Sequence, residues 1–440
     1  MIPVPTRRVA IVAAAAAVVV GAWPGGSAPS LLVVNAVILV SFLIDAATAP
    51  TPGQVDVERQ IPSVIPLGGE AEVVWTVRNS GARRLTIHLA DSLAPSLGAS
   101  TRKVRLVVPG DPRTTMAATA RAALRPTRRG RFDLNRITVR TEGRLGLGAR
   151  QGEVERRGAI RVYPPFDSRD EAELRINKGR LLEVGLRSAV GRGGGTEFEA
   201  LREYTADDEF RRVDWSATAR AGRPIVRTYR AERNQSVLLL LDTGRTMAGR
   251  VGGSPRLEHA MDAVMMLTAV CSRLGDRVGL MAFDRETRAA VPPRSGRAQL
   301  GLVTEAMYEL EPRLVESDYA AAFVDMLSRY RRRSLVVILT ELNEQAVAES
   351  LLPALPRVAR DHLVVTASVQ DPQVAEWASR TPSDIGAGYR RAAAIASLEE
   401  RRRITARLRG IGVTVVDEQP GKLAPVLADA YLKVKATGRL

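Results

Sequence analysis

Residues 236–242 read Ser-Val-Leu-Leu-Leu-Leu-Asp, an uninterrupted apolar run that ends at a carboxylate. Such a run, without polar alternation, is typical of a strand buried on both faces of a parallel sheet. Further apolar runs follow at 277–283, 334–339, 362–369 and 412–416. Between and after them lie segments with helical periodicity, at 257–274, 297–310, 319–330 and roughly 344–358, 390–409 and 421–435. This alternation predicts a doubly wound α/β domain over residues 235–440.

Acidic residues stand at three of the predicted strand ends, namely Asp242, Asp284 and Glu341. Ligands of doubly wound sheets bind at the carboxyl ends of the strands, so these ends are the first place to look for a site. Hydroxyl groups follow Asp242 at Thr243 and Thr246. Carboxylates together with hydroxyls suit a cation that prefers oxygen ligands, and such a site could be completed by Ser317 and Asp318 and by Thr340 and Glu341. Acidic residues at strand ends also serve often as ordinary helix caps, and that reading stays open.

Catalytic and metal-binding motifs of other kinds are absent from the sequence. There is one cysteine, Cys271, and there are three scattered histidines, which excludes intramolecular disulfides and zinc sites built on Cys/His pairs. No Gly-x-Ser-x-Gly elbow and no phosphate-binding loop occurs. The sequence therefore favours a non-enzymatic protein, with a carboxylate-based hydrolase acting through the strand-end acids as the alternative.

Residues 166–234 form a polar linker with 14 basic and 13 acidic residues, a balance that indicates arginine–carboxylate pairing. Thr205 and Asp208 have the spacing of a capping box, which predicts a short helix that runs through Trp215. Gly222 is the expected end of the structure that follows Trp215. The segment suits either a rigid structural network or a partner-docking surface. The residues predicted for docking are Arg202, Glu203, Tyr204, Asp207, Asp208, Arg211, Asp214, Trp215, Arg220, Arg227 and Tyr229.

Residues 51–165 alternate between apolar and polar side chains in short runs, at 72–78, 85–89, 104–108, 116–124, 131–134, 137–140 and 159–163. Glycine- and proline-containing turns separate them, at 68–69, 109–112 and 143–148. Short alternating strands at this spacing predict an antiparallel β-sandwich.

Residues 1–50 contain two uncharged apolar runs, 9–23 and 31–44, with a break at 24–29. Each run is shorter than the ~20 residues of a usual membrane-spanning helix but could cross a thin bilayer. We expect a transmembrane helical hairpin. Because Arg7 and Arg8 precede it, the positive-inside rule places the bulk of the chain in the cytoplasm, as a multi-pass protein of the cell membrane. A cleaved signal peptide followed by an anchor is the alternative.

The basic charge is concentrated near this predicted hairpin. Lys plus Arg is 64 and Asp plus Glu is 48, a net charge of +16. Residues 1–165 hold 22 − 11 = +11, residues 166–234 hold +1, and residues 235–440 hold 28 − 24 = +4. Aromatic residues are only 4% of the chain, which argues against nucleic-acid binding by stacking. The charge is better explained by attraction to anionic lipid.

The strand that ends at Asp242 and the order of the predicted strands resemble a von Willebrand factor A domain. Such domains carry a metal-ion-dependent adhesion site with the pattern Asp-x-Ser-x-Ser. Asp242 matches its first position, Thr246 matches the second serine in chemistry, and Gly244 replaces the first serine. Ser317 and Glu341 match the later ligands by position. The resemblance implies a degenerate site for Mg²⁺ made of Asp242, Thr246, Ser317 and Glu341.

A longer resemblance lies in GRGGGTEFEALREYTADDEFRRVDWSATARAGRPIVRTYRAERN, residues 191–234, which feeds into SVLLLLD. This stretch resembles the signature of the bacterial "domain of unknown function 58" family. The resemblance implies a membrane-anchored protein with a von Willebrand A-like domain and no established enzyme activity. It also implies a MoxR-type AAA+ ATPase as protein partner, in assembly or maturation of other proteins.

Overall fold

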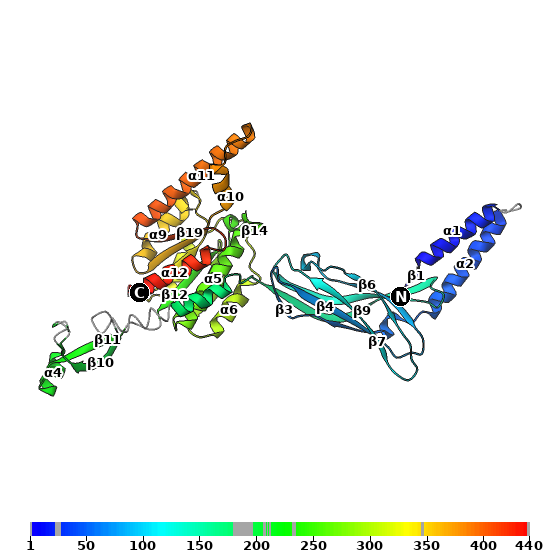
Figure 1. The fold of residues 1–440 in the computed structure, drawn as a ribbon, viewed down its shortest axis with the longest axis horizontal. Helices are drawn as coiled ribbons and strands as arrows, with labels where there is room; N and C mark the ends of the chain where they lie inside the picture. The colour runs from blue at the N-terminus through cyan, green and yellow to red at the C-terminus, as the bar shows by residue number, and fades with distance from the viewer. Residues whose placement is uncertain are drawn as a thin grey trace. The chain divides into compact units, whose positions relative to one another are not determined.

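The structure is a computed structural model that describes residues 2–22, 28–178, 197–205, 208, 210, 213–230, 235–344 and 347–437. The chain divides into two compact units, Met1–Tyr163 and Pro164–Leu440. The first unit consists of two helices and two sheets, and the second contains a six-stranded sheet with helices on both faces (Figure 1).

The sheets of the first unit pack face to face around one core. One sheet has the order β1-β9-β8-β5-β6, with β3 added beside β9, and the other has the order β2-β4-β7. The strands are β1 (Ile2–Pro5), β2 (Asp56–Gln60), β3 (Val64–Pro66), β4 (Ala71–Asn79), β5 (Leu85–Asp91), β6 (Lys103–Val108), β7 (Met116–Leu124), β8 (Gly130–Glu142) and β9 (Gly148–Tyr163). Residues from both sheets, among them Trp75 on β4 and Val139 on β8, share the core. The strands pair antiparallel, as predicted, except for β3, which runs parallel to β9.

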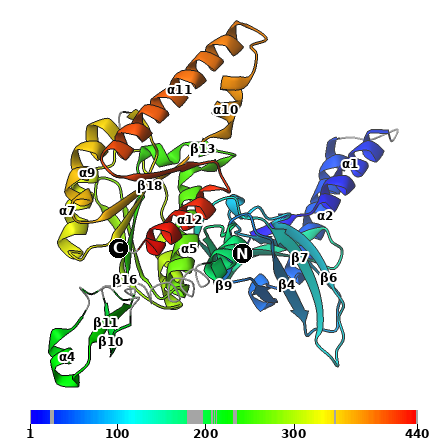
Figure 2. The same ribbon diagram turned by 60° about the vertical axis from the view of Figure 1, so that its left-hand side comes forward.

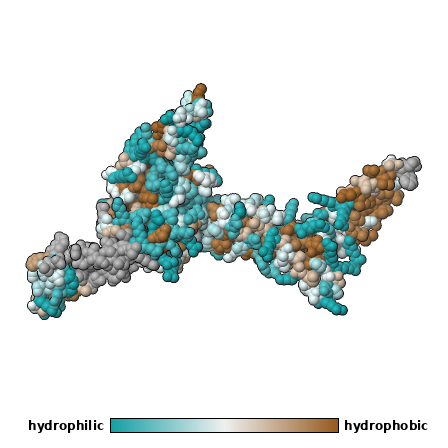
Figure 3. Space-filling view, in the orientation of Figure 1, coloured by the Kyte–Doolittle hydropathy of each residue, from teal (hydrophilic) through white to brown (hydrophobic). Residues whose placement is uncertain are grey.

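The two N-terminal helices are α1 (Arg7–Ala22) and α2 (Ala28–Thr48), and they contact each other along their length (Figures 1 and 2). Apolar side chains cover both of them (Figure 3). Among the described residues, one helix is long and apolar enough to cross a membrane, the span Pro29–Gln54. The 16-residue helix α1 is shorter, about 24 Å at 1.5 Å per residue.

The sheet of the second unit has the strand order β16-β15-β12-β17-β18-β19. These strands are β12 (Ser236–Asp242), β15 (Arg277–Phe283), β16 (Thr287–Arg294), β17 (Leu335–Leu339), β18 (Leu363–Val369) and β19 (Thr414–Glu418). All neighbours pair parallel except β16, which is antiparallel to β15. The sequence did not predict β16, because Pro292 and Pro293 indicate a loop, but an edge strand tolerates proline.

Alternate residues of β12 point to opposite faces of the sheet, and each face has its own core. Leu239 and Leu241 pack with α5 (Arg256–Arg273), α6 (Ala298–Met307) and α12 (Leu423–Ala436). Leu238 and Leu240 pack with α7 (Tyr319–Arg329), α9 (Leu352–Ala359) and α11 (Ile385–Gly410). A further helix, α10 (Pro372–Ser379), lies beside α11 (Figure 1). The fully apolar run SVLLLL is therefore explained by burial on both faces.

The linker segment contributes a two-stranded antiparallel sheet, β10 (Glu197–Glu203) and β11 (Ile225–Arg230), with α4 (Trp215–Ala221) between them. We call the described residues between 197 and 230 the β10–β11 segment. The predicted capping interaction is present, because the Asp208 carboxylate accepts hydrogen bonds from the N–H and the hydroxyl of Thr205. The helix itself was misplaced: α4 begins at Trp215 instead of ending there, and Asp214 caps it. Gly222 ends α4 in the left-handed region at φ 65°, as predicted.

Candidate functional site

Asp242, at the carboxyl end of β12, is fully buried and accepts four hydrogen bonds. Its Oδ1 accepts from the Gly244 N–H (2.8 Å) and from the Ser317 hydroxyl (2.5 Å). Its Oδ2 accepts from Tyr319 Oη (2.8 Å) and from Thr340 Oγ1 (2.7 Å). Burial raises the pKa of Tyr319 well above its ordinary value, so this phenol is a proton donor at neutral pH. Both oxygens of the buried carboxylate are thus satisfied within the protein.

The loop after β12 has no room for a side chain at position 244. A Cβ placed on Gly244 would lie 2.1 Å from Ser317 Oγ and 2.9 Å from the Val315 carbonyl oxygen. The Ser317 hydroxyl therefore occupies the space in which a serine at 244 would stand. This explains physically why glycine replaces the first serine of the adhesion-site pattern.

The other two predicted metal ligands do not join Asp242. Glu341, at the end of β17, accepts a hydrogen bond from Arg401 Nη1 (2.6 Å) and pairs with Arg256 Nε (3.0 Å). Thr246 lies in the short helix Arg245–Ala248, and none of the described contacts links its hydroxyl to Asp242. Among the described residues no group of three or more His, Cys, Asp and Glu is placed to hold a metal ion.

The residues present do not fit Mg²⁺. Asp242 is the only carboxylate of the buried cluster, and hydroxyl donors saturate it, whereas Glu341 is neutralised by arginines. Divalent cations of this kind need several oxygen ligands, usually more than one of them charged. Of the four predicted ligands, the structure joins Ser317 to Asp242 and keeps Thr246 and Glu341 apart from it. What it shows is a hydrogen-bonded cluster of Asp242, Ser317, Tyr319 and Thr340, which ties β12 to β17 and α7.

Arg401 on α11 holds together the ends of three strands, β17, β18 and β19. It makes a bidentate pair with Asp417 of β19, with Nε–Oδ2 and Nη2–Oδ1 both at 2.7 Å. It also donates to Glu341 after β17, to the Ser368 hydroxyl and to the Val369 carbonyl of β18. The acid at the end of β15, Asp284, is also buried, with Arg288 and Arg313 3.6 and 3.7 Å away. Every strand-end acid named in the sequence is thus engaged by donors or cations of the same unit.

The β10–β11 segment contains the predicted docking residues and is braced by ion pairs. Arg202 pairs with Asp208 through two hydrogen bonds of 2.8 and 2.5 Å, and this pairing lowers the pKa of Asp208 to about 2. Asp214 pairs with Arg227 (2.7 Å) while also capping α4. Glu203 pairs with Arg223, a residue that the sequence reasoning did not select.

Other predicted docking residues have ordinary roles or fall outside the description. Arg220 donates to the carbonyl of Ser216 one turn earlier in α4. Tyr204 is half-buried and its N–H bonds to the carbonyl of Pro224. Asp207 and Arg211 lie outside the described residues, and for Tyr229 only its backbone pairing with Phe198 is described.

Two aromatic side chains of this segment are exposed and touch each other. Phe210 is 68% exposed and Trp215 is 61% exposed, and their rings meet edge to face with centroids 5.5 Å apart. Leu201 of β10 is also exposed. The sequence selected Trp215 but not Phe210, although both belong to the quoted signature. Exposed aromatics on a braced scaffold are the residues that most often anchor protein interfaces.

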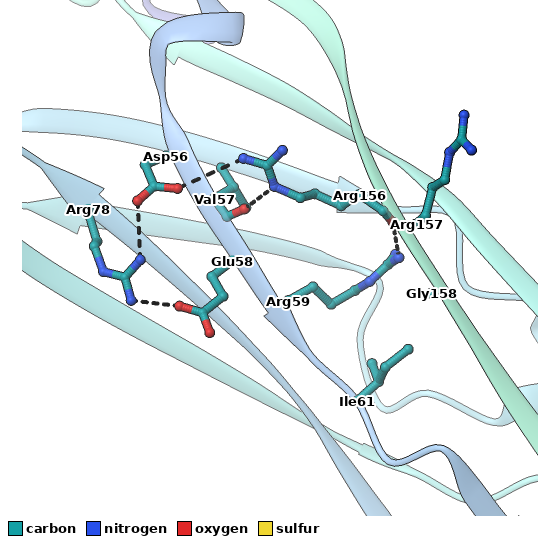
Figure 4. A pocket seen from close by; sticks show the side chains of 9 residues that line it. All are labelled: Asp56, Val57, Glu58, Arg59, Ile61, Arg78, Arg156, Arg157 and Gly158. Atoms are coloured by element: carbon teal, nitrogen blue, oxygen red, sulfur yellow. Dashed lines mark hydrogen bonds and ion pairs between the residues drawn. The ribbon is translucent and has the colours of Figure 1, made fainter.

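The first unit has a charged hollow between β2 and the bulged part of β9 (Figure 4). Arg78 bridges Asp56 (3.2 Å) and Glu58 (2.6 Å), and Arg156 Nε donates to the Val57 carbonyl (2.6 Å). Arg59 passes into the core, where it pairs with Asp91 (2.8 Å), which also accepts from Trp75 Nε1 (2.7 Å). Most charges of this hollow pair with neighbours of the same unit, so they help to hold the two sheets together.

Comparison with known proteins finds a family match within the second unit and curated relatives of this chain. The profile of the family described as "Protein of unknown function DUF58" matches residues 200–380. One uncharacterized protein of Mycobacterium bovis and two of Mycobacterium tuberculosis are each 30% identical over 187 residues, 42% of this chain. The chain spans 58% of the length of these curated relatives.

Among solved structures, the ASH / PapD-like domain of human CEP192 is similar over 26% of this chain and 87% of that domain, at 10% sequence identity. The TM-score is 0.18, which is too low to indicate a shared fold. The family match, by contrast, includes the Phe210–Trp215 pair, the Asp242 cluster and Glu341. The similarity of this chain to proteins of the DUF58 family therefore covers both candidate regions of the second unit.

Proposed function

We propose that this protein is a membrane-anchored, non-enzymatic interaction scaffold of the DUF58 family that binds a protein partner through the β10–β11 segment. The observation that carries the proposal is the exposed Phe210–Trp215 pair, which lies within the family match. Two arginine–aspartate pairs, Arg202–Asp208 and Arg227–Asp214, brace the same segment. A preorganised aromatic surface loses little conformational entropy when it docks.

In this proposal, the second unit of the chain is a von Willebrand factor A-like domain. Support comes from the strand order β16-β15-β12-β17-β18-β19, with one antiparallel edge strand, and from the acid at the end of β12. The partner that the family resemblance suggests is a MoxR-type AAA+ ATPase, with a role in protein assembly or maturation. The proposal does not require Mg²⁺, because Asp242 already accepts hydrogen bonds from three hydroxyl groups and one backbone amide.

The hydrolase alternative is weakened by the state of the strand-end acids. A carboxylate that acts as a general acid, base or nucleophile needs a lone pair or proton directed at a substrate. Each oxygen of Asp242 accepts two hydrogen bonds within the protein, and Glu341 is tied to two arginines. Hydrolysis of a test ester or phosphoester that Asp242→Asn abolishes would reverse this preference.

Membrane attachment through α1 and α2, with the rest of the chain in the cytoplasm, completes the proposal. It is supported by the apolar surface of both helices and by the span Pro29–Gln54. The expected result is that the full chain floats with vesicles and stays with them in high salt. Recovery in the soluble fraction after lysis in high salt would contradict the anchor.

Crosslinking in cells followed by purification tests the partner. Wild type should recover an AAA+ ATPase, and Trp215→Ala should weaken the association roughly 30-fold or more, the usual cost of removing an aromatic hot spot of about 2 kcal/mol. Trp377→Ala is the matched control, because Trp377 is also partly exposed (36%) but lies on α10. If no AAA+ ATPase is recovered, the partner is wrong. Equal effects of the two tryptophan variants would instead place docking elsewhere.

A further inference from the structure

The turn between β8 and β9, residues 143–148, is fixed to the end of α2 by Asp45. This carboxylate is only 2% exposed and accepts hydrogen bonds from the N–H groups of Leu145 (2.7 Å), Leu147 (2.7 Å) and Gly148 (2.9 Å). A Cβ on Gly148 would lie 2.6 Å from the Phe42 carbonyl oxygen, so the turn and the helix are in close backbone contact. The one acidic residue near the end of the apolar helix therefore attaches the helix to the sandwich.

The same turn is also fixed to the beginning of α1. The Thr6 N–H donates to the Leu147 carbonyl (3.0 Å), and Arg8 Nη1 donates to the Leu145 carbonyl (3.2 Å). Strand β1, which leads into α1, pairs antiparallel with β9, and Pro5 at its end lies opposite Gly148. The turn thus lies at the level where α1 begins and α2 ends, which is the level of the bilayer surface if both helices enter a membrane.

Leu145 is exposed at this position although its backbone is held. Its side chain is 61% exposed, while its N–H and carbonyl groups are bonded to Asp45 and Arg8. The fixed backbone of the turn therefore holds this apolar side chain at the level where α1 begins and α2 ends. It is placed as an interfacial anchor would be.

Basic residues lie on the turn and on the elements next to it. Arg7, Arg8 and Arg144 are exposed, and Arg140 and Arg150 are half-buried beside them on β8 and β9. The nearby acids are Asp45, whose oxygens are taken by three amides, and Glu142, which pairs with His88 (2.7 Å). The local balance of 5 − 2 = +3 matches negatively charged headgroups.

We propose that the β8–β9 turn is a lipid-binding site, in which Leu145 enters the bilayer interface and Arg7, Arg8 and Arg144 contact the phosphate groups of anionic lipids. This inference rests on the proposed membrane anchor and adds to it a defined contact of the sandwich with the bilayer. It fixes the rotation of the sandwich about the helices, because only one edge of the sandwich carries this turn.

The experiment uses the full chain with a fluorescent probe at position 145. The only cysteine, Cys271, is fully buried, so Leu145→Cys provides a single reactive thiol for a polarity-sensitive dye. The matched control is Val64→Cys, also an exposed apolar position of the same unit (39%). Val64 pairs with Arg161, thirteen residues along β9 from Gly148, which is about 43 Å at ~3.3 Å per residue.

Both labelled proteins are reconstituted into vesicles of phosphatidylcholine, with or without phosphatidylglycerol, and quenched with spin-labelled lipid. We expect the dye at 145, but not at 64, to be quenched. Phosphatidylglycerol should increase the quenching, and Arg144→Glu in the labelled variant should remove that increase. If both proteins float with the vesicles but position 145 is quenched no more than position 64, the lipid site is refuted and the anchor stands.

Other outcomes are equally decisive. Quenching at 145 that is indifferent to phosphatidylglycerol refutes the role of the arginines in binding anionic lipid. Failure of both proteins to float refutes the anchor and the lipid site together. Labelling of the wild-type chain measures the background from Cys271, which burial should keep negligible.

Discussion

Placing a methyl group on Gly244 should break the hydrogen bond between Ser317 and Asp242. Gly244 has φ −77°, a conformation open to any residue, so Gly244→Ala introduces no backbone strain. Its new Cβ would instead lie 2.1 Å from Ser317 Oγ, closer than any real contact allows. The serine side chain must therefore rotate away from the carboxylate, which is fully buried.

The magnitude follows from the bond that is lost. A hydrogen bond to a charged acceptor contributes about 1.5–3 kcal/mol, so Ser317→Ala should lower the free energy of unfolding by about that amount. Gly244→Ala should cost at least as much, because it removes the same bond and crowds the Val315 carbonyl. In the double variant the bond is lost only once. The two effects should then fall short of additivity by about 1.5–3 kcal/mol.

Native-state hydrogen exchange of the β12 amides in the full chain measures these differences, because exchange there reports opening of the second unit. Gly301→Ala is the matched control: it lies in α6, and its Cβ would have no atom within 4 Å. This control should be neutral or stabilising by up to about 1 kcal/mol. If the two effects add to within about 0.5 kcal/mol, the Ser317 hydroxyl does not fill the space at position 244 and the reasoning fails.

Three further predictions concern charged and titratable groups. Arg401→Met should lower the free energy of unfolding by about 3 kcal/mol in urea titrations, because Asp417 loses its bidentate partner and Glu341 keeps only Arg256. Arg360→Met, in an exposed pair, should cost less than about 1 kcal/mol. Burial lowers the pKa of His362, so near pH 6.5 and below the unfolded chain binds more protons than the folded chain, and the free energy of unfolding should fall as pH drops below 6.5. In His362→Phe the urea midpoint should lose less with falling pH, because the contribution of this imidazole is gone. Arg202→Met should raise the pKa of Asp208 from about 2 toward 3.8, as ¹³C titration of the carboxyl would show. The loss of stability that wild type shows as pH falls from 3.8 to 2 should therefore be smaller in the variant.

Much of the second unit could be predicted from apolar runs and helical periodicity. The runs beginning at Ser236 and Arg277 coincide with β12 and β15, since a strand buried on both faces needs continuous apolar residues. Strand β16 could not be predicted, because an edge strand faces water on one side and tolerates its two prolines. The first half of β9 was missed because it is mostly polar: its pairing with β8 and only a few buried side chains, such as Val154, hold it as a strand.

The candidate site was harder to predict, because an acidic residue at a strand end does not reveal which side chains will contact it in the fold. The sequence placed Asp242 and Ser317 in one site, and they do meet. It also placed Glu341 there, but α11, far along the chain, brings Arg401 to this acid. Tyr319 gave no separate signal, since a tyrosine beside a predicted helix is equally typical of a core.

The acidic residues at the carboxyl ends of the strands are already bonded within the protein, and this indicates where a partner can bind. In doubly wound sheets the carboxyl ends of the strands usually hold the ligand, because loops there leave polar groups open. Here hydroxyls saturate Asp242, and Arg401 occupies Glu341 and Asp417, so a ligand would have to displace several charged hydrogen bonds to bind. The Phe210–Trp215 pair requires no such displacement, since both rings already face solvent. Burial of these rings by a partner would be favourable without breaking any existing hydrogen bond. This favours the β10–β11 segment over the carboxyl ends of the strands as the docking surface.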